Sequence, residues 1–300
     1  MSFRPARPED HSRILEIHNA SWPEHFRDLE RLLRYDQIFP TLRFVGERAG
    51  SVVAHASIRD HGNRYELEIA VVPEHRGQGI GSGFCSFLLD QLPALPPKPL
   101  QAFTKETHLP FAERRGWREA MRSYHQYLEL PRFDPAPFAG LLKGLEAQGY
   151  SFRAFDQLTE PDREARLHAL VNATEVDIPA TTRVEPVDLE GFRLKYTHGP
   201  NFLPEGSFVA VHDGLYAGLT FTRRRSPTSV HTGMTGVLSA HRGRGLAMAL
   251  KARVAAYAKA AGMLELHTNN AATNLGILTV NERLGFVREP AQIELHKEFG

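Results

Sequence analysis

The chain of 300 residues has one cysteine, no long apolar run and almost no net charge, and each absence excludes a class of protein. Its single cysteine, Cys85, cannot form a disulfide within the chain. The 36 basic and 35 acidic side chains leave a net charge of +1, which predicts no general attraction to nucleic acid or to an anionic membrane. No apolar stretch approaches the roughly 20 residues of a membrane span, and none near the N-terminus is typical of a secretory signal. We therefore expect a cytoplasmic protein with no nucleic-acid partner and no membrane partner.

Closely spaced metal ligands are also missing. The 15 histidines include no HExxH motif or comparably tight pair, so no metal site is expected. Cys85 lies in the apolar segment GFCSFLL. A buried structural side chain is the expectation there, because no group that could activate the thiol is visible.

The length of the chain and its 42% of hydrophobic residues suffice for two domains that each bury a core. A proline-rich segment, ELPRFDPAPFAG at 129–140, separates two regions of regular patterning. Such a segment is typical of a connection between domains. We predict an N-terminal domain at residues 1–130, a linker at 131–140 and a C-terminal domain at 141–300.

Both predicted domains show one order of elements. In each, a strand and helical segments precede a hairpin, and an apolar strand then leads through a glycine-rich loop into a helix; a strand, a helix and a strand follow. The hairpins are expected to turn at 46–50 and at Asp213-Gly214. The closing strands are expected in SYHQYLEL at 123–130 and in FVREPAQIELHKEF at 286–299. This repetition predicts two domains of mixed α and β structure with one plan.

The glycine-rich loops are HRGQGIG at 75–81 and HRGRGLA at 241–247. Each is expected between a strand and a helix, where the unpaired N–H groups of a helix N-terminus attract a phosphate. Glycine allows the backbone to approach a bulky anion, and Arg76 and Arg242 can add positive charge. The spacing fits neither the dinucleotide fingerprint nor the Walker loop. A pyrophosphate site of another kind is therefore predicted in each domain.

The pattern Arg-x-x-Gly-x-Gly or Ala resembles the pyrophosphate loop of the GNAT superfamily of N-acetyltransferases. The segment NLGILTVNERLGF at 274–286 is similar to the closing helix and strand of that family, and LPFAERRGW at 109–117 is a weaker match. The resemblance implies an α+β protein of two tandem GNAT-like domains, each a mixed, splayed sheet flanked by helices. It also implies acetyl-CoA (coenzyme A) as the cofactor. The implied reaction moves an acetyl group to the amine of a small molecule by direct attack in a ternary complex, and the oligomeric state stays open.

The resemblance implies that strand ends, loop residues and the asparagine opening the closing helix hold the cofactor. These residues are Val71, Val72, Arg76, Gly77, Gly79 and Gly81 in the first domain, and Val237, Leu238, Arg242, Gly243, Gly245, Ala247 and Asn274 in the second. Aligning the two closing segments at Gly116 and Gly285 puts Lys105 of the first domain opposite Asn274. We therefore expect the second domain to contain the better cofactor site and to carry out the transfer.

A proton acceptor is required, because a protonated amine cannot attack. Alternation in YELEIAVV puts Glu66 and Glu68 on one face of a strand, and Glu68 is the catalytic candidate of the first domain; a solvated strand face is the alternative. The second domain has Thr232 and Met234 at these positions. Its catalytic candidate is Asp177 in TEVDIPATTR, and an exposed loop aspartate is the alternative.

The tyrosine that usually serves as the acid in this family is absent. Asn281 and Ala112 stand at its positions, and neither can donate a proton as a phenol does. His231 and His198 are weaker candidates, because a lone histidine is more often structural. The missing tyrosine keeps a second function open, a non-catalytic sensor or scaffold that binds acyl-CoA. Transfer from a larger donor, such as an aminoacyl carrier, is a third.

Overall fold

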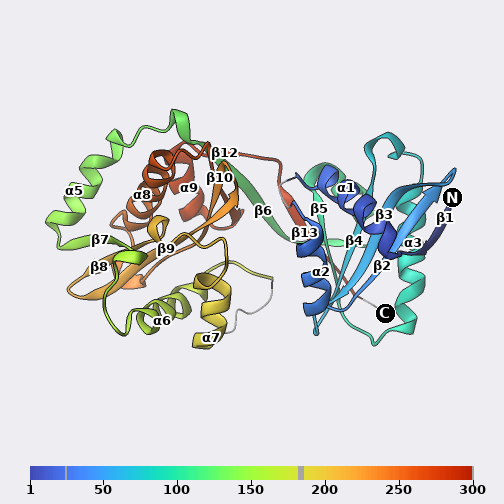
Figure 1. Ribbon diagram of the computed structural model, residues 1–300, viewed down its shortest axis with the longest axis horizontal. Coiled ribbons are helices and arrows are strands. Elements are labelled where there is room, and N and C mark those ends of the chain that lie inside the picture. The colour runs from blue at the N-terminus through green and yellow to red at the C-terminus, as the bar shows by residue number, and fades with distance from the viewer. Residues whose placement is uncertain (24–25, 182–185, 299–300) are drawn as a thin grey trace. The chain divides into compact units, whose positions relative to one another are not determined.

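The computed structural model describes residues 1–23, 26–181 and 186–298 (Figure 1). Parts of two predicted segments, the helix at 23–36 and TEVDIPATTR at 174–183, lie outside these residues. The chain forms two compact units: unit 1 comprises Met1–Ala120 and Ile293–Gly300, and unit 2 comprises Met121–Gln292. Among the described residues, no helix combines the length and apolarity needed to cross a membrane.

Unit 1 is built on a mixed sheet. Its strands, in spatial order, are β1 (Ser2–Pro5), β2 (Thr41–Arg48), β3 (Ser51–Asp60), β4 (Tyr65–Val71), β5 (Leu100–Lys105) and β13 (Gln292–Lys297). The pairs from β1 to β4 are antiparallel, and β4 pairs with β5 in parallel. Ala49 and Gly50 both have positive φ, which confirms the predicted first hairpin turn.

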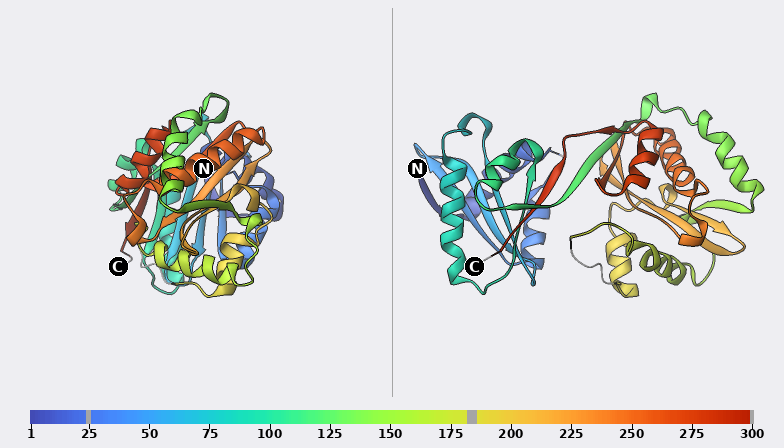
Figure 2. Two further views of the ribbon diagram at one scale, coloured as in Figure 1. Left: turned by 90° about the vertical axis from the view of Figure 1, so that its left-hand side faces the viewer. Right: turned by 180° about the vertical axis from the view of Figure 1, so that it is seen from behind.

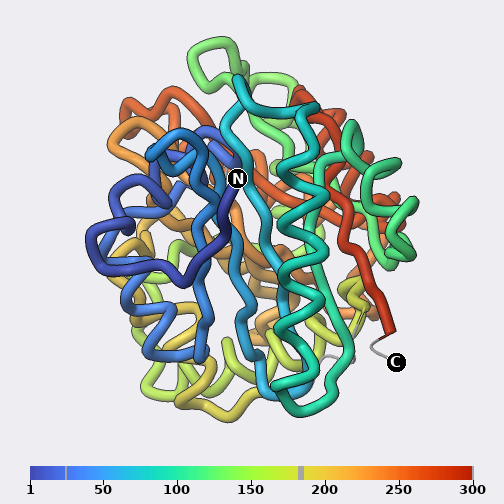
Figure 3. Tube along the Cα trace, turned by 90° about the vertical axis from the view of Figure 1, so that its right-hand side faces the viewer, coloured from blue at the N-terminus to red at the C-terminus, as the bar shows by residue number. Residues whose placement is uncertain are grey.

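Helices cover both faces of the sheet of unit 1. They are α1 (His11–Ser21), α2 (Leu29–Ile38), α3 (Ile80–Gln91) and α4 (Leu109–Glu113). Both α1 and α3 contact β3 and β4, and the tube view shows α1 and α2 on one side of these strands with α3 on the other (Figure 3). Seven successive residues of β3 are buried, as expected for a strand covered on both faces.

Unit 2 repeats this plan. Its strands, in spatial order, are β6 (Arg118–Glu129), β11 (Glu265–Ala271), β10 (Ser229–Val237), β9 (Leu215–Ser226), β8 (Phe208–His212) and β7 (Tyr150–Ala154), and β12 (Val287–Arg288) pairs with β6. Again one inner pair, β10 with β11, is parallel. Asp213 and Gly214 both have positive φ between β8 and β9, which confirms the predicted hairpin turn.

Two hydrophobic clusters flank the sheet of unit 2. The helices are α5 (Ala139–Ala147), α6 (Arg163–Glu175), α7 (Leu189–Phe192), α8 (Leu246–Ala260) and α9 (Leu275–Leu284). Residues of α8 pack with Ala210 of β8 in one cluster, whereas residues of α6 pack with Val209 in the other. Because successive strand residues face opposite sides, α8 and α6 cover opposite faces, as Figure 2 shows.

The compact units differ from the predicted domain boundaries. The segment at 121–130 belongs to unit 2 rather than to the first domain, because β6 pairs along its length with β11. The predicted final strand at 286–299 divides into β12 in unit 2 and β13, which lies beside β5 in unit 1. A buried hydrogen bond of 2.6 Å from Gln101 of β5 to Glu294 fastens this strand. Each half of the sequence thus supplies a strand to the unit formed mainly by the other half.

The parallel strands of each unit separate after a short paired stretch. Residues Tyr65–Leu67 of β4 pair with β5, and β4 then continues to Val71. In unit 2, Ser229–His231 of β10 pair with β11, and β10 continues to Val237. Each unit therefore has a fork between two parallel strands, and the glycine-rich loop follows the longer arm of the fork.

Candidate active site

The two glycine-rich loops share one backbone conformation. Gly77 and Gly243 both have φ of 75°, while Gly79 and Gly245, with φ of 80° and 92°, directly precede α3 and α8. These left-handed values favour glycine. A Cβ atom added at Gly77, Gly79 or Gly243 would meet open space, whereas one added at Gly245 would come within 2.8 Å of Leu141. Both loops can hold a pyrophosphate of the kind that the sequence predicts.

The loop arginines are fixed in the same way in both units. Arg76 Nε donates to the carbonyl of Val71, and Arg242 Nε donates to that of Val237, each at 2.9 Å. Their remaining partners differ. Arg76 Nη2 lies 3.2 Å from the hydroxyl of Ser21, whereas Arg242 forms an ion pair with Asp177. Among the described residues, a carboxylate therefore lies beside the arginine of the second loop and not beside that of the first.

Asp177 thus lies at the phosphate loop of unit 2, and its side chain is 52% exposed. Asp177 pairs with Arg242, whereas the sequence predicts that it lies near the transferred acetyl group. A carboxylate beside the loop arginine competes with an anionic ligand for the guanidinium. The geometry therefore indicates that Asp177 affects anion binding by Arg242.

The strand ends before the loops present backbone groups to each fork. The N–H groups of Val72 and Leu238 donate to carbonyls of β3 and β9, at 3.0 and 2.9 Å, so they are occupied within the sheets. Alternate residues of a strand turn their N–H groups to opposite sides. The N–H groups of Val71 and Val237 therefore point into the forks. Of the predicted backbone contacts to the cofactor arm, those from Val71 and Val237 fit the geometry, and N–H donation from Val72 and Leu238 does not.

Gly81 and Ala247 are the second residues of α3 and α8, so their small side chains lie beside the anion cradle. Asn274 caps α9 and accepts a hydrogen bond from the N–H of Ile277 at 3.4 Å. At the aligned place in unit 1, Lys105 lies over the ring of Trp22, 5.4 Å from its centroid. The cap of α9 is therefore a polar side chain that accepts a hydrogen bond, whereas the cap of α4 in unit 1 is His108, whose side chain makes no such bond.

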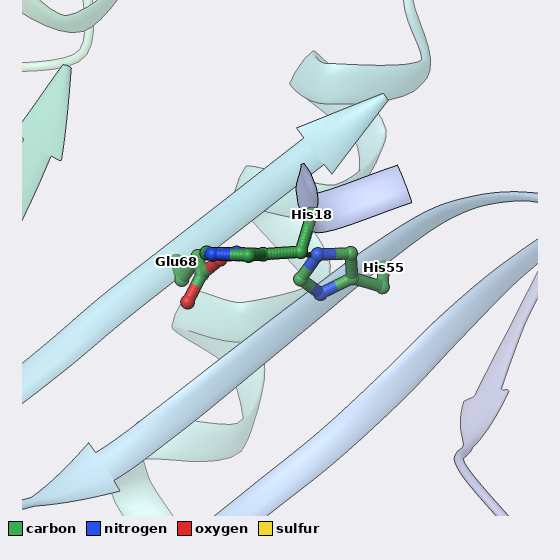
Figure 4. Close-up of side chains that lie close together, drawn as sticks. All are labelled: His18, His55 and Glu68. Carbon is green, nitrogen blue, oxygen red and sulfur yellow. Dashed lines mark hydrogen bonds and ion pairs between the residues drawn. The ribbon is translucent and has the colours of Figure 1, made fainter. Parts of the chain in front are cut away.

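The fork of unit 1 contains a buried polar cluster around Glu68 (Figure 4). Glu68 Oε1 lies 2.6 Å from His18 Nδ1 and 3.8 Å from His55 Nε2, and Oε2 accepts from Arg27 at 3.0 Å. Burial alone would raise the pKa of Glu68, but Arg27 and the two histidines outweigh it and hold the pKa well below the usual range. Glu68 is therefore ionised and engaged at both oxygens, which makes it a weak proton acceptor.

Glu66, on the same face of β4, belongs to another group. It accepts from Arg59 at 2.5 Å and lies 3.3 Å from His61. Burial would raise its pKa, but His61 and Arg59 together lower it. The two glutamates of β4 are thus enclosed in separate ion-paired groups, and a solvated strand face is the wrong interpretation of them.

Unit 2 has a buried carboxylate that sequence reasoning missed. Glu175, the last residue of α6, is 8% exposed and accepts from the hydroxyl of Tyr196 at 2.7 Å and from Lys195. Its second oxygen, Oε2, is buried without a hydrogen-bond partner. The preceding residue, Thr174, lies against Gly236 of β10, where an added Cβ would come within 2.4 Å of its hydroxyl. Glu175 therefore lies near the open arm of the second fork.

The family's acid position is occupied by a structural amide in unit 2. Asn281 is fully buried, and its amide nitrogen donates to Gln126 and Asn270, each at 2.8 Å. Ala112, the counterpart in unit 1, is buried, and its methyl side chain has no acidic proton to donate. His231 is an equally poor proton carrier, because burial lowers its pKa to about 3. His198 is half exposed and lies 3.8 Å from Glu164, outside the fork.

A buried lysine of α8 was also missed. Lys251 is 1% exposed, its ammonium group lies 3.4 Å from the hydroxyl of Thr268, and burial lowers its pKa to about 7. The regular apolar pattern of the helix gave no warning, because a lysine beside alanines usually marks the exposed face. Cys85, as expected, is buried, and burial raises the pKa of its thiol.

A mixed sheet with a fork that leads to a glycine-rich helix N-terminus, present twice, defines a class of proteins that hold a pyrophosphate-bearing cofactor between two parallel strands. The sequence profile of the Acetyltransferase (GNAT) family matches residues 11–110 and 173–286, which span both forks and both loops. The chain therefore belongs to the GNAT acetyltransferase family and carries two copies of its domain.

Particular relatives agree with this assignment. The mycothiol acetyltransferase of Frankia casuarinae is 26% identical over 266 residues, which cover 83% of this chain and 73% of that protein. A GCN5-related N-acetyltransferase from Sphaerobacter thermophilus has a TM-score of 0.72 at 19% identity, with 99% of this chain and 95% of that one covered. A tandem GNAT protein from the clavulanic acid biosynthesis pathway has a TM-score of 0.66 at 21% identity, with coverage of 100% and 98%. The last two likenesses show the fold.

Proposed function

We propose that this protein is an acetyl-CoA-dependent N-acetyltransferase that moves an acetyl group to the amine of a small molecule by direct attack in a ternary complex. The observation that carries the proposal is the twofold combination of a fork and an open, glycine-capped helix N-terminus with a fixed arginine. The GNAT family, to which the chain belongs, supports acetyl-CoA as the donor. When bound, acetyl-CoA supplies an activated acyl group as a thioester.

We assign the transfer to unit 2. Arg242 and the N–H groups around Gly243 and Gly245 would hold the pyrophosphate, and the N–H of Val237 would hold the arm of the cofactor. The small side chain of Ala247 leaves room beside the phosphates. In unit 1, Arg76, Gly77, Gly79, Gly81 and Val71 would form a second and weaker cofactor site.

The carboxylates of the two units support this assignment. Glu68 has both oxygens engaged and a lowered pKa, so it holds little tendency to accept a proton. Glu175 has an oxygen without a hydrogen-bond partner among the described residues, and the residue before it, Thr174, lies against Gly236 of β10. We propose Glu175 as the group that accepts the proton of the attacking amine, directly or through water. Asp177, the catalytic candidate from the sequence, would instead compete with the pyrophosphate for Arg242.

Two groups beside Glu175 favour this role. Tyr196 and Lys195 both contact Oε1, so they fix the carboxylate, and no described residue donates a hydrogen bond to the buried Oε2. Burial, and next Glu175 itself, raise the pKa of Tyr196, which therefore keeps its proton and remains a donor. A carboxylate held in this way needs no reorganisation when an amine arrives.

The test is incubation of the protein with acetyl-CoA and a panel of small amines, with release of the thiol as the readout. Because the Frankia relative is a mycothiol acetyltransferase, amines of small thiol-bearing molecules are the first class to try. Turnover with at least one amine is expected. Binding of acetyl-CoA without turnover across the panel would favour the non-catalytic sensor or scaffold.

A further inference from the structure

Three side chains from three elements of unit 1 converge in its core. His18 of α1, His55 of β3 and Glu68 of β4 each turn one possible ligand atom toward a common point, and these atoms lie within 4.8 Å of one another (Figure 4). Within the described part of the chain, this is the group of histidine and carboxylate side chains that can surround a metal ion. The proposed acetyl transfer makes no use of it.

His55 is the unusual member of the group. Its side chain is almost fully enclosed, and neither ring nitrogen has a hydrogen-bond partner among the described residues. A buried polar group without a partner is rare, because it loses its hydration and gains nothing in return. Nε2 points toward Glu68 Oε1 at 3.8 Å, which is too long for a hydrogen bond. A metal ion between these two atoms would give Nε2 of His55 a partner.

The distances suit an ion of the size of zinc. Two ligands at about 2.0–2.1 Å from a tetrahedral zinc ion lie about 3.3 Å apart. The separation of 2.6 Å between His18 Nδ1 and Glu68 Oε1 would widen, and that of 3.8 Å between His55 Nε2 and the same oxygen would shorten. Changes of this size are within the reach of side-chain rotation.

The protonation states are those that a metal requires. Burial lowers the pKa of His55 to about 4, so its imidazole is neutral near pH 7. Arg27 and the histidines keep Glu68 ionised. His18 Nδ1 faces this carboxylate, so binding of the ion through Nδ1 requires the neutral tautomer of His18 that carries its proton on Nε2.

From these contacts we propose that His18, His55 and Glu68 form a site for one divalent transition-metal ion, with zinc the best match to two imidazole nitrogens and one carboxylate oxygen. The ion would join α1 to β3 and β4. Arg27 contacts Oε2, the oxygen opposite the site, so it orients the carboxylate and leaves Oε1 for the metal. Under this assignment Glu68 is a ligand, which agrees with transfer in unit 2.

The test measures metal binding itself. The tag-free protein is stripped of metal with a chelator, which is then removed, and Co²⁺ is added while the visible d–d absorption is followed. We expect saturation at one equivalent with the intense bands of a four- or five-coordinate ion, and their loss when Zn²⁺ displaces Co²⁺. His55→Gln and Glu68→Gln should weaken the affinity at least tenfold, because each removes one of three ligands.

The matched control is His267→Gln in unit 2. His267 is also buried and also lies beside a glutamate, Glu265, at 2.9 Å. This variant should keep the affinity and the spectrum of the original protein. Circular dichroism of each variant before titration identifies any that has lost its fold, and the remaining ligand variant then decides.

A Co²⁺ spectrum with only weak octahedral bands, or an affinity that His55→Gln and Glu68→Gln leave unchanged, would overturn the proposal. So would the absence of binding at millimolar metal. Since no readout involves acetyl-CoA, these outcomes leave the proposed acetyltransferase activity untouched, and a failure of that activity would leave the metal site untouched.

Discussion

Unit 1 and unit 2 share an anion cradle but differ in the polar groups of the adjoining fork. The two loops agree in φ at both glycines, and each arginine makes the same 2.9 Å bond to the preceding strand. At the forks, Glu68 is saturated by His18 and Arg27, whereas Glu175 keeps one oxygen without a partner. The comparison teaches that backbone geometry for a cofactor can persist in both copies of a domain while the side chains for proton transfer diverge.

The largest effect is expected from a carboxylate placed at the second anion cradle. Ala247→Glu should reduce turnover at least 100-fold, because a negative charge beside the first turn of α8 repels a pyrophosphate. The matched change in unit 1 is Gly81→Glu, at the second residue of α3, where an added Cβ would make only an ordinary contact with Phe111. It should leave most of the turnover. Steady-state rates at several acetyl-CoA concentrations measure both.

Ala247→Gln and Gly81→Gln control for side-chain size in that experiment. Gly245 is a poorer place for the test, because it has φ of 92° and an added Cβ would come within 2.8 Å of Leu141. If Gly81→Glu abolishes turnover while Ala247→Glu preserves it, the assignment of transfer to unit 2 is reversed.

The second effect concerns the two carboxylates. Glu175→Gln should lower kcat by about 100-fold or more, with little change in KM for acetyl-CoA, since it removes a proton acceptor and no phosphate contact. Glu68→Gln should change kcat less than threefold. An unchanged kcat in Glu175→Gln would show that Glu175 has only a structural role.

A third comparison uses the buried residues of the two helices that follow the loops. Lys251 and Cys85 each lie nine positions after the loop arginine, and both are buried. The lowered pKa of Lys251, about 7, means that between pH 7 and 10.5 the unfolded chain binds the extra proton. Stability should therefore rise with pH across this window, by about 1.4 kcal/mol per unit at most, and be lost again as the pH falls toward 7.

Lys251→Met removes this buried amine. It should raise the Tm at pH 7 by several degrees and flatten the pH dependence between 7 and 10, whereas Cys85→Ala should leave the slope between pH 7 and 8 as it is, because the thiol is protonated there in both the folded and the unfolded chain. Thermal unfolding at a series of pH values measures both variants. A slope that survives in Lys251→Met would show that Lys251 is charged in the folded protein.

The smallest effect is expected at the loop arginines. Asp177→Asn should tighten acetyl-CoA binding about two- to fivefold, because it frees Arg242 from a carboxylate whose exposed ion pair is weak. In unit 1, Ser21→Ala should have no comparable effect, since a hydroxyl does not compete in charge. Calorimetric titration with acetyl-CoA is the measurement. Weaker binding by Asp177→Asn would instead mean that Asp177 holds Arg242 in its working position.

Much of the fold could be predicted because its signals are local. The hairpin turn at Asp213-Gly214 and the glycine before each helix require a left-handed backbone, which glycine and aspartate tolerate. The repeated loop and the order of elements gave the tandem architecture, and the family profile confirms it. The compact units divide near residue 120 and again near 292, whereas the sequence predicts one boundary at 129–140. Proline marks a break in regular structure, but only pairing decides which sheet β6 and β13 join.

The sites were predicted less well than the loops, because side chains far apart in the sequence form them. Spacing along the chain gave no metal site, yet His18, His55 and Glu68 come together from a helix and two strands. Glu175 ends a helix of ordinary pattern, and its enclosure by Tyr196 and Lys195 depends on a segment 20 residues away. Nothing local distinguishes such a carboxylate from an exposed one.

The sequence by itself determined the two anion cradles of this protein, because a loop that needs positive φ and a free helix N-terminus is encoded within seven residues. Only the tertiary structure decided which carboxylates are engaged, which oxygen is left without a partner, and which strand completes each sheet. These properties depend on burial and on partners from distant segments. Electrostatic interactions and desolvation act across space, so their balance is set only when the chain has folded.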